Sequence, residues 1–182
     1  MPHHSPVTND VRRSASRVAT LVAVPLALLA GFVAFQALKP ATPKPQETGP
    51  VTMPGKALDA RQAEVCRALL SRMPEQVRDR QRRQVTAGHE QNAAFGDPAI
   101  TLVCGGETAS FAPTEMVYPL SGVCWVPDPA GTRWTTVDRE VPVVINVPKD
   151  YDSPGQWVAA FSGAISATVP PAHVPSGCKD PQ

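Results

Sequence analysis

The chain has 182 residues, with 17 Lys and Arg against 16 Asp and Glu, which gives a formal net charge of +1. This balance excludes a globally basic nucleic-acid-binding protein and a globally acidic chain. Charged residues make up 18% of the chain, and its 21 prolines are about twice the usual proportion. The length is sufficient for one compact domain of ordinary size.

An uncharged apolar segment lies near the N-terminus, at Val18–Leu38. A helix of this length would be about 30 Å long, which matches the hydrocarbon thickness of a bilayer. The alternative, a helix buried in a protein core, is disfavoured because the segment has no polar face. Pro25 is compatible with a membrane helix. We therefore expect a transmembrane signal anchor at residues 18–38.

The orientation of this segment is predicted from the residues around it. Arg12, Arg13 and Arg17 precede it, and positive residues favour the cytoplasmic side. All four cysteines follow it, as expected where only the C-terminal part reaches an oxidising compartment. We therefore predict a single-pass protein of the plasma membrane, with residues 1–17 in the cytoplasm and residues 39–182 outside. A cleaved signal peptide is the alternative, although the sequence lacks a small-x-small cleavage site.

Two regions of different composition follow the apolar segment. Residues 39–57 contain five prolines among Thr, Lys and Gly. Such a composition favours extended polyproline II and cannot bury a core, so this region is expected to be a stiff linker. Residues 58–182 are predicted to form one extracytoplasmic domain stabilised by disulfide bonds.

Two helices are expected, one near each end of this domain. The first begins at Asp59, whose carboxylate can cap the backbone while Gln62 completes a capping box, and it ends near Pro74. The second has Ser153 as its N-cap and ends near Val169. Each has an apolar stripe that can face a core. The stripes consist of Leu58, Val65, Leu69 and Met73 in the first helix, and of Trp157, Phe161, Ile165 and Val169 in the second.

Extended segments lie between the two helices. Four of them are rich in β-branched and aromatic residues and are separated by turn signals. Pro142 suggests that the last of the four starts at an edge of the sheet. The basic stretch 75–85 is expected to contain a helical turn that runs into an extended segment. The four strands are expected at residues 99–104, 123–126, 133–138 and 141–147. The predicted fold is therefore α+β, with a mostly antiparallel sheet of about four strands.

The four cysteines predict two disulfide bonds. Three connectivities are possible. We favour Cys66–Cys104, which would tie the first helix to a strand, and Cys124–Cys178, which would anchor the C-terminal tail. In the chain-entropy model, each bond adds about 4 kcal/mol to the free energy of unfolding. A four-cysteine zinc site is the alternative, but the spacings contain no C-x-x-C pair, so no metal is expected.

Few residues point to catalysis. The sequence has no G-x-S-x-G nucleophile elbow, no P-loop and no metal-ligand spacing. His89 could act as a general base together with Asp97, which gives an enzyme of envelope metabolism as the alternative function. A pocket that brings these two side chains within hydrogen-bond reach would support that alternative. No cofactor is expected.

One segment of the domain is strongly basic. Residues 61–83 contain seven arginines against three acidic residues, a net charge of +4, whereas residues 84–182 contain four basic and ten acidic residues, a net charge of −6. A basic segment attracts anionic lipid, an anionic wall polymer or an acidic partner, and nucleic acid is not expected outside the cytoplasm. The alternative, which we favour, is that the arginines pair with acidic residues of their own domain. The candidate binding residues are Arg78, Arg80, Arg82, Arg83 and Asp97.

Several stretches of the domain carry a recognisable pattern. They are Val65–Leu70, Met73–Glu75, Arg82–Val85 and Ala94–Gly105, with weaker likeness at Gly122–Trp125 and Val147–Tyr151. These stretches resemble an actinobacterial family, the domain of unknown function 3515 family, over roughly residues 60–170. The resemblance implies a small envelope protein with an N-terminal hydrophobic segment, and it supplies no catalytic residue.

The sequence therefore predicts a membrane-tethered, disulfide-stabilised domain that contacts an envelope protein or a wall component rather than an enzyme. A carrier of small ligands is a third hypothesis, which would require a sizeable apolar cavity.

Overall fold

The computed structural model describes residues 25–36, 47–112, 115–172, 175 and 178. The chain divides into two units, Met1–Lys44 and Pro45–Gln182. In the first unit, residues 25–36 form a helix with exposed side chains. No helix among the described residues has the length and apolar character needed to cross a membrane. The predicted tail at residues 1–17 lies outside the described residues, and so do both ends of the predicted anchor.

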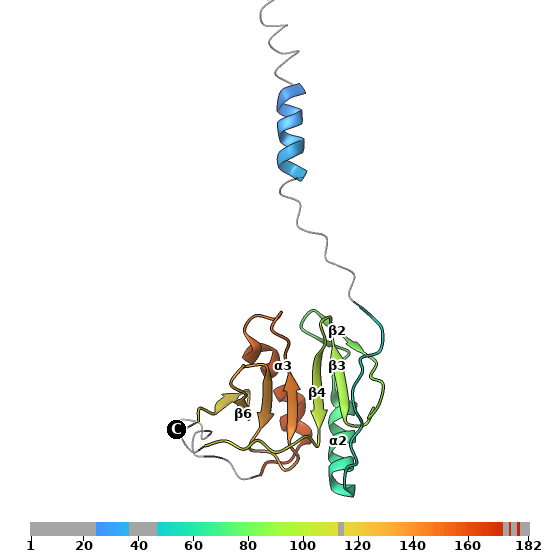
Figure 1. Ribbon diagram of the computed structural model, residues 1–182, viewed down its shortest axis with the longest axis vertical. Coiled ribbons are helices and arrows are strands. Elements are labelled where there is room, and N and C mark those ends of the chain that lie inside the picture. The colour runs from blue at the N-terminus through green and yellow to red at the C-terminus, as the bar shows by residue number, and fades with distance from the viewer. Residues whose placement is uncertain (1–24, 37–46, 113–114, 173–174, 176–177, 179–182) are drawn as a thin grey trace, which may run out of the picture. The chain divides into compact units, whose positions relative to one another are not determined.

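The second unit contains an antiparallel sheet of eight strands (Figure 1). The strand order is β1-β2-β3-β4-β8-β7-β6-β5, and every neighbouring pair is antiparallel. The strands are β1 (Gln76–Val77), β2 (Arg80–Arg83), β3 (Asn92–Phe95), β4 (Ile100–Cys104), β5 (Tyr118–Leu120), β6 (Val123–Pro127), β7 (Arg133–Thr136) and β8 (Val143–Asn146). The α+β class is confirmed, and the prediction of about four strands was wrong.

The four predicted strands correspond to β4, β6, β7 and β8, and the other four were missed. The missed strands have only two to four residues each, and their composition hides them. Strand β2 is Arg-Gln-Arg-Arg, β3 is Asn-Ala-Ala-Phe, and β5 contains Pro119. These segments are strands because they pair with neighbouring strands in the sheet. Sheet propensity depends on the neighbours of a residue more than on the residue itself.

Two local expectations for the sheet were also wrong. The helical turn expected in the stretch 75–85 is instead the β1–β2 hairpin, in which Arg78 has a positive φ of 55°. Strand β8 is not at an edge, because it pairs with β4 on one side and β7 on the other. Pro142 immediately precedes β8, so its lack of an N–H group removes no hydrogen bond from the strand itself. Its carbonyl accepts a hydrogen bond from Gly105 N at 2.9 Å.

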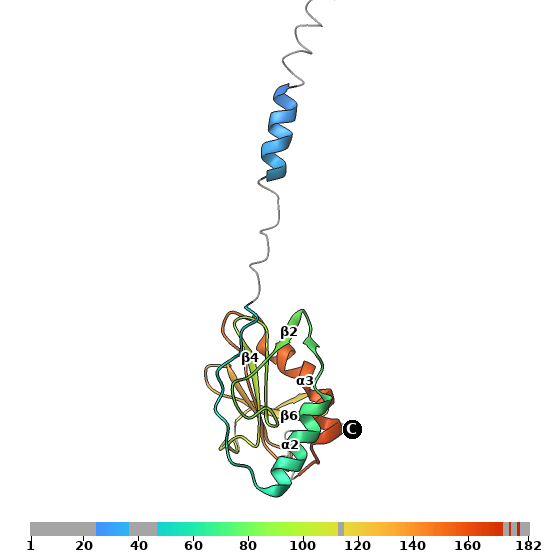
Figure 2. The ribbon, with the colours of Figure 1, turned by 90° about the vertical axis from the view of Figure 1, so that its right-hand side faces the viewer.

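Two helices, α2 (Ala60–Arg72) and α3 (Pro154–Thr168), cover one face of the sheet, as the edge-on view shows (Figure 2). The capping box at the start of α2 is present, with Gln62 N donating to the Asp59 carboxylate at 2.8 Å. Ser153 is the N-cap of α3, as predicted, but its side chain makes no capping hydrogen bond. The main core lies between these helices and the sheet. Of the predicted stripe residues, Leu58 precedes α2 and is partly buried against this core, and the others are buried: Val65, Leu69, Met73, Trp157, Phe161, Ile165 and Val169.

The other face of the sheet is partly covered by the segment of chain that precedes α2. Val51 N donates to Gln84 O at 2.8 Å, and Thr86 N donates to Val51 O at 3.0 Å, so this segment pairs in parallel with the chain after β2. Met53 is 6% exposed and packs with Val85 and Ala94. The region expected to be a linker therefore contributes to the fold from about residue 49 onward.

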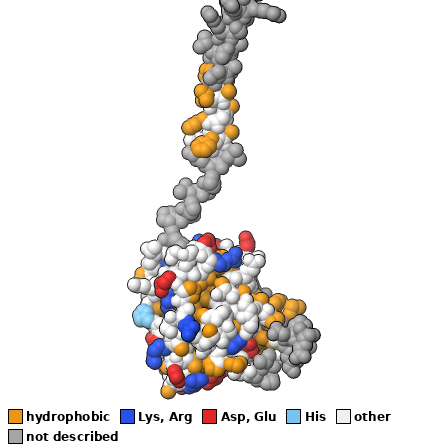
Figure 3. Space-filling model, turned by 180° about the vertical axis from the view of Figure 1, so that it is seen from behind, with side chains coloured by type: hydrophobic (Ala, Val, Ile, Leu, Met, Phe, Trp, Pro, Cys, Tyr) orange, Lys and Arg blue, Asp and Glu red, His pale blue; other side chains and the backbone are white. Residues whose placement is uncertain are grey.

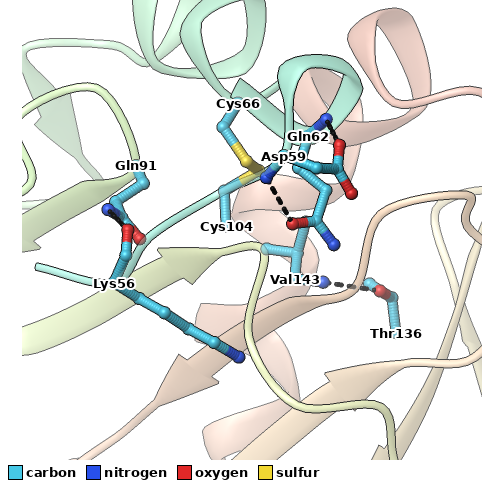
Figure 4. Close-up of a disulfide and its surroundings, with 8 residues drawn as sticks. All are labelled: Lys56, Asp59, Gln62, Cys66, Gln91, Cys104, Thr136 and Val143. Carbon is cyan, nitrogen blue, oxygen red and sulfur yellow. Dashed lines mark hydrogen bonds between the residues drawn. A yellow bond between two sulfur atoms is a disulfide. The ribbon is translucent and has the colours of Figure 1, made fainter. Parts of the chain in front are cut away.

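Both favoured disulfide bonds are present. Cys66–Cys104 joins α2 to β4 beside the Asp59–Gln62 capping box (Figure 4), and both of its cysteines are 0% exposed. Cys124–Cys178 joins β6 to the C-terminal region. Since the bonds close loops of 38 and 54 residues, each is expected to add about 4 kcal/mol to the free energy of unfolding.

Replacing Asp59 with Ala should lower the free energy of unfolding by about 1 kcal/mol, because the first turn of α2 loses its side-chain acceptor. Asp59→Asn is the matched control, since its side-chain oxygen can still accept this hydrogen bond. Thermal unfolding of the full chain in non-ionic detergent, followed by tryptophan near-ultraviolet circular dichroism, measures the difference. Equal stability of wild type and Asp59→Ala would contradict the prediction.

Candidate functional site

Arg83 is part of the structural framework of the domain. Its side chain is 8% exposed. Its Nε and Nη2 atoms donate to Gly49 O at 3.0 and 2.7 Å, and its Nη1 atom donates to Gly96 O at 3.0 Å. The carboxylate of Glu47 lies 3.4 Å from Nη2. Arg83 therefore joins the N-terminal segment to the turn after β3, and its donors are occupied.

Arg78 and Arg80 lie over aromatic rings. The Cζ atom of Arg78 is 4.5 Å from the centroid of the Trp157 ring, and that of Arg80 is 5.3 Å from the Tyr151 ring. The two rings contact each other edge to face. Tyr151 Oη donates to Pro98 O at 2.6 Å, and burial raises the pKa of Tyr151, so the phenol keeps its proton at neutral pH. These two arginines thus cover buried aromatic groups through cation–π contacts.

Arg82 has a different environment. Its side chain is 26% exposed, and its nearest acidic group, Glu75 Oε1, is 3.7 Å from Nη1, too far for a hydrogen bond. Among the described residues, none accepts a hydrogen bond from its guanidinium. Because a guanidinium carries five N–H donors, Arg82 has unused donor capacity beside the protein interior.

The surroundings of Arg82 form an open pocket of about 510 Å³. It lies beyond the end of β1, which pairs only with Arg80 and Gln81 of β2. The chain between β2 and β3 turns back through Gly88, whose carbonyl accepts from the N–H groups of Gln91 and Asn92. This turn brings His89 to the pocket. The lining residues are Glu75, Arg82, Arg83, Gln84, Val85, His89 and Asn92.

Asn92 holds this loop in place. It is 2% exposed, and its Nδ2 atom donates to Pro54 O at 2.9 Å and Ala87 O at 3.0 Å. In the part of the chain that the structure describes, its Oδ1 atom has no hydrogen-bond partner. Asn92 thus ties the pocket loop to the same N-terminal segment that Arg83 binds.

The structure does not bring His89 and Asp97 together. Asp97 follows β3, whereas His89 precedes it, and the four-residue strand between them is about 13 Å long at 3.3 Å per residue. The Asp97 carboxylate accepts from Glu47 N at 3.3 Å, and Asp97 is not among the residues that line the His89 pocket. The catalytic pair of the alternative hypothesis is therefore not assembled.

The charge of the basic segment is largely balanced within the domain. Arg61 forms two hydrogen bonds of 2.9 Å with Glu140, which lower the pKa of that carboxyl below its usual value. Arg80 contacts Asp79 at 3.4 Å. On the helix side of the domain, blue side chains alternate with red ones rather than forming one continuous basic surface (Figure 3). Pairing of arginines within their own domain is thus seen, although the acidic partners are mostly close in sequence.

Two further surface features bear on the other hypotheses. An open groove of about 660 Å³ near the start of α3 is lined by apolar groups that include Tyr118 and Trp134, whose rings pack edge to face. It is not an enclosed cavity of the kind a small-ligand carrier needs. Among the described residues, no three His, Cys, Asp or Glu side chains cluster so as to hold a metal ion.

Glu75, Gln84 and Asn92 are neighbours of Arg82 that the sequence did not predict, and His89 lies beside Arg82 and not beside its predicted partner Asp97. A signal existed in the length of the connection. Eight residues separate β2 from β3, and Gly88 among them favours a turn that reverses the chain between two paired strands. That signal requires β2 to be recognised as a strand, and its composition prevents this.

Replacing Arg83 with Gln should lower the free energy of unfolding by about 2 kcal/mol, because the carbonyls of Gly49 and Gly96 lose their donors. Arg82→Gln is the matched control, with a change within about 0.5 kcal/mol, since Arg82 makes no side-chain hydrogen bond. Chemical denaturation of the full chain in detergent measures both. Equal effects of the two substitutions would contradict the prediction.

Comparison with known proteins gives a family but no described activity. No curated protein and no solved structure matches this chain. One family model, described as a protein of unknown function (DUF3515), matches residues 22–174. The match includes the basic segment, the pocket around Arg82 and three of the four cysteines. The chain therefore belongs to the DUF3515 family, as its sequence motifs indicated.

Proposed function

We propose that this chain is a membrane-tethered extracytoplasmic protein whose folded domain contacts another component of the cell envelope and catalyses no reaction. The observation that carries the proposal is the pairing of all four cysteines in two disulfide bonds. Such bonds persist in oxidising compartments and are rare where thiols are kept reduced.

The apolar N-terminal segment supports the tethering part of the proposal. Of Val18–Leu38, the part at residues 25–36 is described, and it is helical. Leu26, Leu28 and Phe32 on this helix are 59–69% exposed. A helix that exposes large apolar side chains in this way requires an apolar environment, and a bilayer supplies it.

A non-enzymatic role is favoured over the alternative by the placement of the candidate catalytic groups. A general base must lie within hydrogen-bond reach of its partners. His89 and Asp97 lie beyond opposite ends of β3, and His89 instead shares a pocket with Arg82. The guanidinium and the imidazole ring both carry N–H donors, which suits recognition of an anionic group.

The proposal predicts that the cysteines are oxidised in the cell. Free thiols in intact cells are blocked with N-ethylmaleimide, and the membrane fraction is then denatured, reduced and treated with a polyethylene-glycol maleimide. We expect four additions per chain after reduction and none without it. Recovery of the full-length chain from the soluble fraction with four free thiols would contradict both the compartment and the tether.

The location of the domain is tested separately by protease treatment of spheroplasts. Protease outside the membrane should remove the folded domain and leave an N-terminal epitope tag protected. A disulfide-free cytosolic protein serves as the control for membrane integrity. Protection of the whole chain would contradict the proposed orientation.

A further inference from the structure

We propose that the pocket between Arg82 and His89 is a binding site for a phosphate ester group of the cell envelope, carried by a lipid headgroup or by an anionic wall polymer. This inference rests on the proposed function for the choice of ligand source. The binding chemistry itself rests on the pocket alone.

The guanidinium of Arg82 is the centre of the site. Of the arginines nearby, Arg83 donates to two carbonyls, whereas Arg78 and Arg80 lie over aromatic rings and do not line the pocket. Arg82 donates no side-chain hydrogen bond to any described residue, yet its side chain is about three-quarters buried. A hydrogen bond between an ionised donor and an anionic acceptor is about twice as strong as one between neutral groups. The planar fork of a guanidinium matches two oxygens of a phosphate group.

The rest of the pocket suits the same group. His89 and Gln84 are exposed residues in its lining and carry further N–H donors. Glu75 is the one acidic residue of the lining, and its side chain is 87% exposed. Because it lies 3.7 Å from Arg82 without a hydrogen bond, an incoming phosphate can replace it at the guanidinium. The volume of about 510 Å³ also leaves room for the alcohol part of the ester.

The chain between the proposed anchor and the folded domain is short. Only residues 39–46 separate the proposed anchor from Glu47, and covalent geometry limits eight residues to about 30 Å. Glu47 and Gly49 are bound by Arg83, which lines the pocket next to Arg82. This short covalent connection makes a lipid headgroup one of the two phosphate sources to test.

The first experiment uses the full chain in a phosphate-free non-ionic detergent and titrates it with glycerol 3-phosphate. Binding is followed by calorimetry and by the NMR signals of the His89 ring, and a dissociation constant in the millimolar range is expected. Arg82→Gln should weaken binding at least tenfold. Arg72→Gln is the matched control, because Arg72 lies in the last turn of α2 and does not line the pocket, so its affinity should equal that of the wild type.

Glu75→Gln supplies a test that does not depend on losing binding. Because Glu75 competes with the ligand for Arg82, its removal should strengthen binding severalfold. Equal weakening by Arg82→Gln and Arg72→Gln would show a diffuse charge effect and overturn the site. Unchanged or weaker binding by Glu75→Gln, or acetate binding as tightly as glycerol 3-phosphate, would overturn it as well.

A second experiment distinguishes the two phosphate sources. In nanodiscs that contain phosphatidylglycerol, a headgroup that enters the pocket should lower the apparent affinity for glycerol 3-phosphate severalfold in the wild type but not in Arg82→Gln. An unchanged affinity together with binding of a soluble polyglycerol phosphate would assign the site to a wall polymer. Binding of neither source would overturn the proposal.

The failure of this inference is separable from failure of the proposed function. The thiol and protease assays do not involve the pocket, so Arg82→Gln should give the same oxidised, membrane-bound chain as the wild type. A correctly located and oxidised chain whose pocket binds no phosphate would overturn the site and leave the proposed function standing.

Discussion

The guanidinium of Arg83 sets the arrangement around the pocket. It joins the backbone at Gly49, 34 residues away, to the backbone at Gly96, 13 residues away. Side chains alternate between the two faces of a strand. Because Arg83 binds the N-terminal segment on one face of β2, Arg82 lies on the opposite face. There Arg82 pairs in register with Phe95, whose ring packs against α3. Arg83 is thus held by hydrogen bonds to the backbone, whereas the N–H donors of Arg82 are free to bind a ligand.

The elements that were predictable are those whose signals are local. The capping box at Asp59, the proline after Ser153 and the four-residue spacing of the α3 stripe each lie within a few turns of chain, and the structure contains all three. The β-branched strands were recognisable for the same reason. The favoured cysteine pairing was also correct because it joined a predicted helix to a predicted strand and a tail to a middle strand.

The rest could not be read from local pattern. Strand β2 has no β-branched residue, and it is ordered by its neighbours β1 and β3 together with the salt-linked Arg83. The different roles of four arginines in one short stretch depend on aromatic rings and carbonyls that are distant in sequence. The same dependence explains why His89 belongs with Arg82 rather than Asp97, since only the hairpin of β2 and β3 places the two residues together.

The attachment of the segment before α2 has a practical consequence for anyone who wishes to isolate the folded part. Composition alone places the domain boundary at Leu58. A fragment that begins there would lack Met53 and would expose the apolar side chains of Val85 and Ala94 to solvent. It would also remove two hydrogen bonds that Arg83 donates to Gly49 O and one that Asn92 donates to Pro54 O. A fragment for expression should therefore start upstream of Glu47. The proline-rich segment that precedes α2 covers part of the sheet face opposite the helices and belongs to the folded domain.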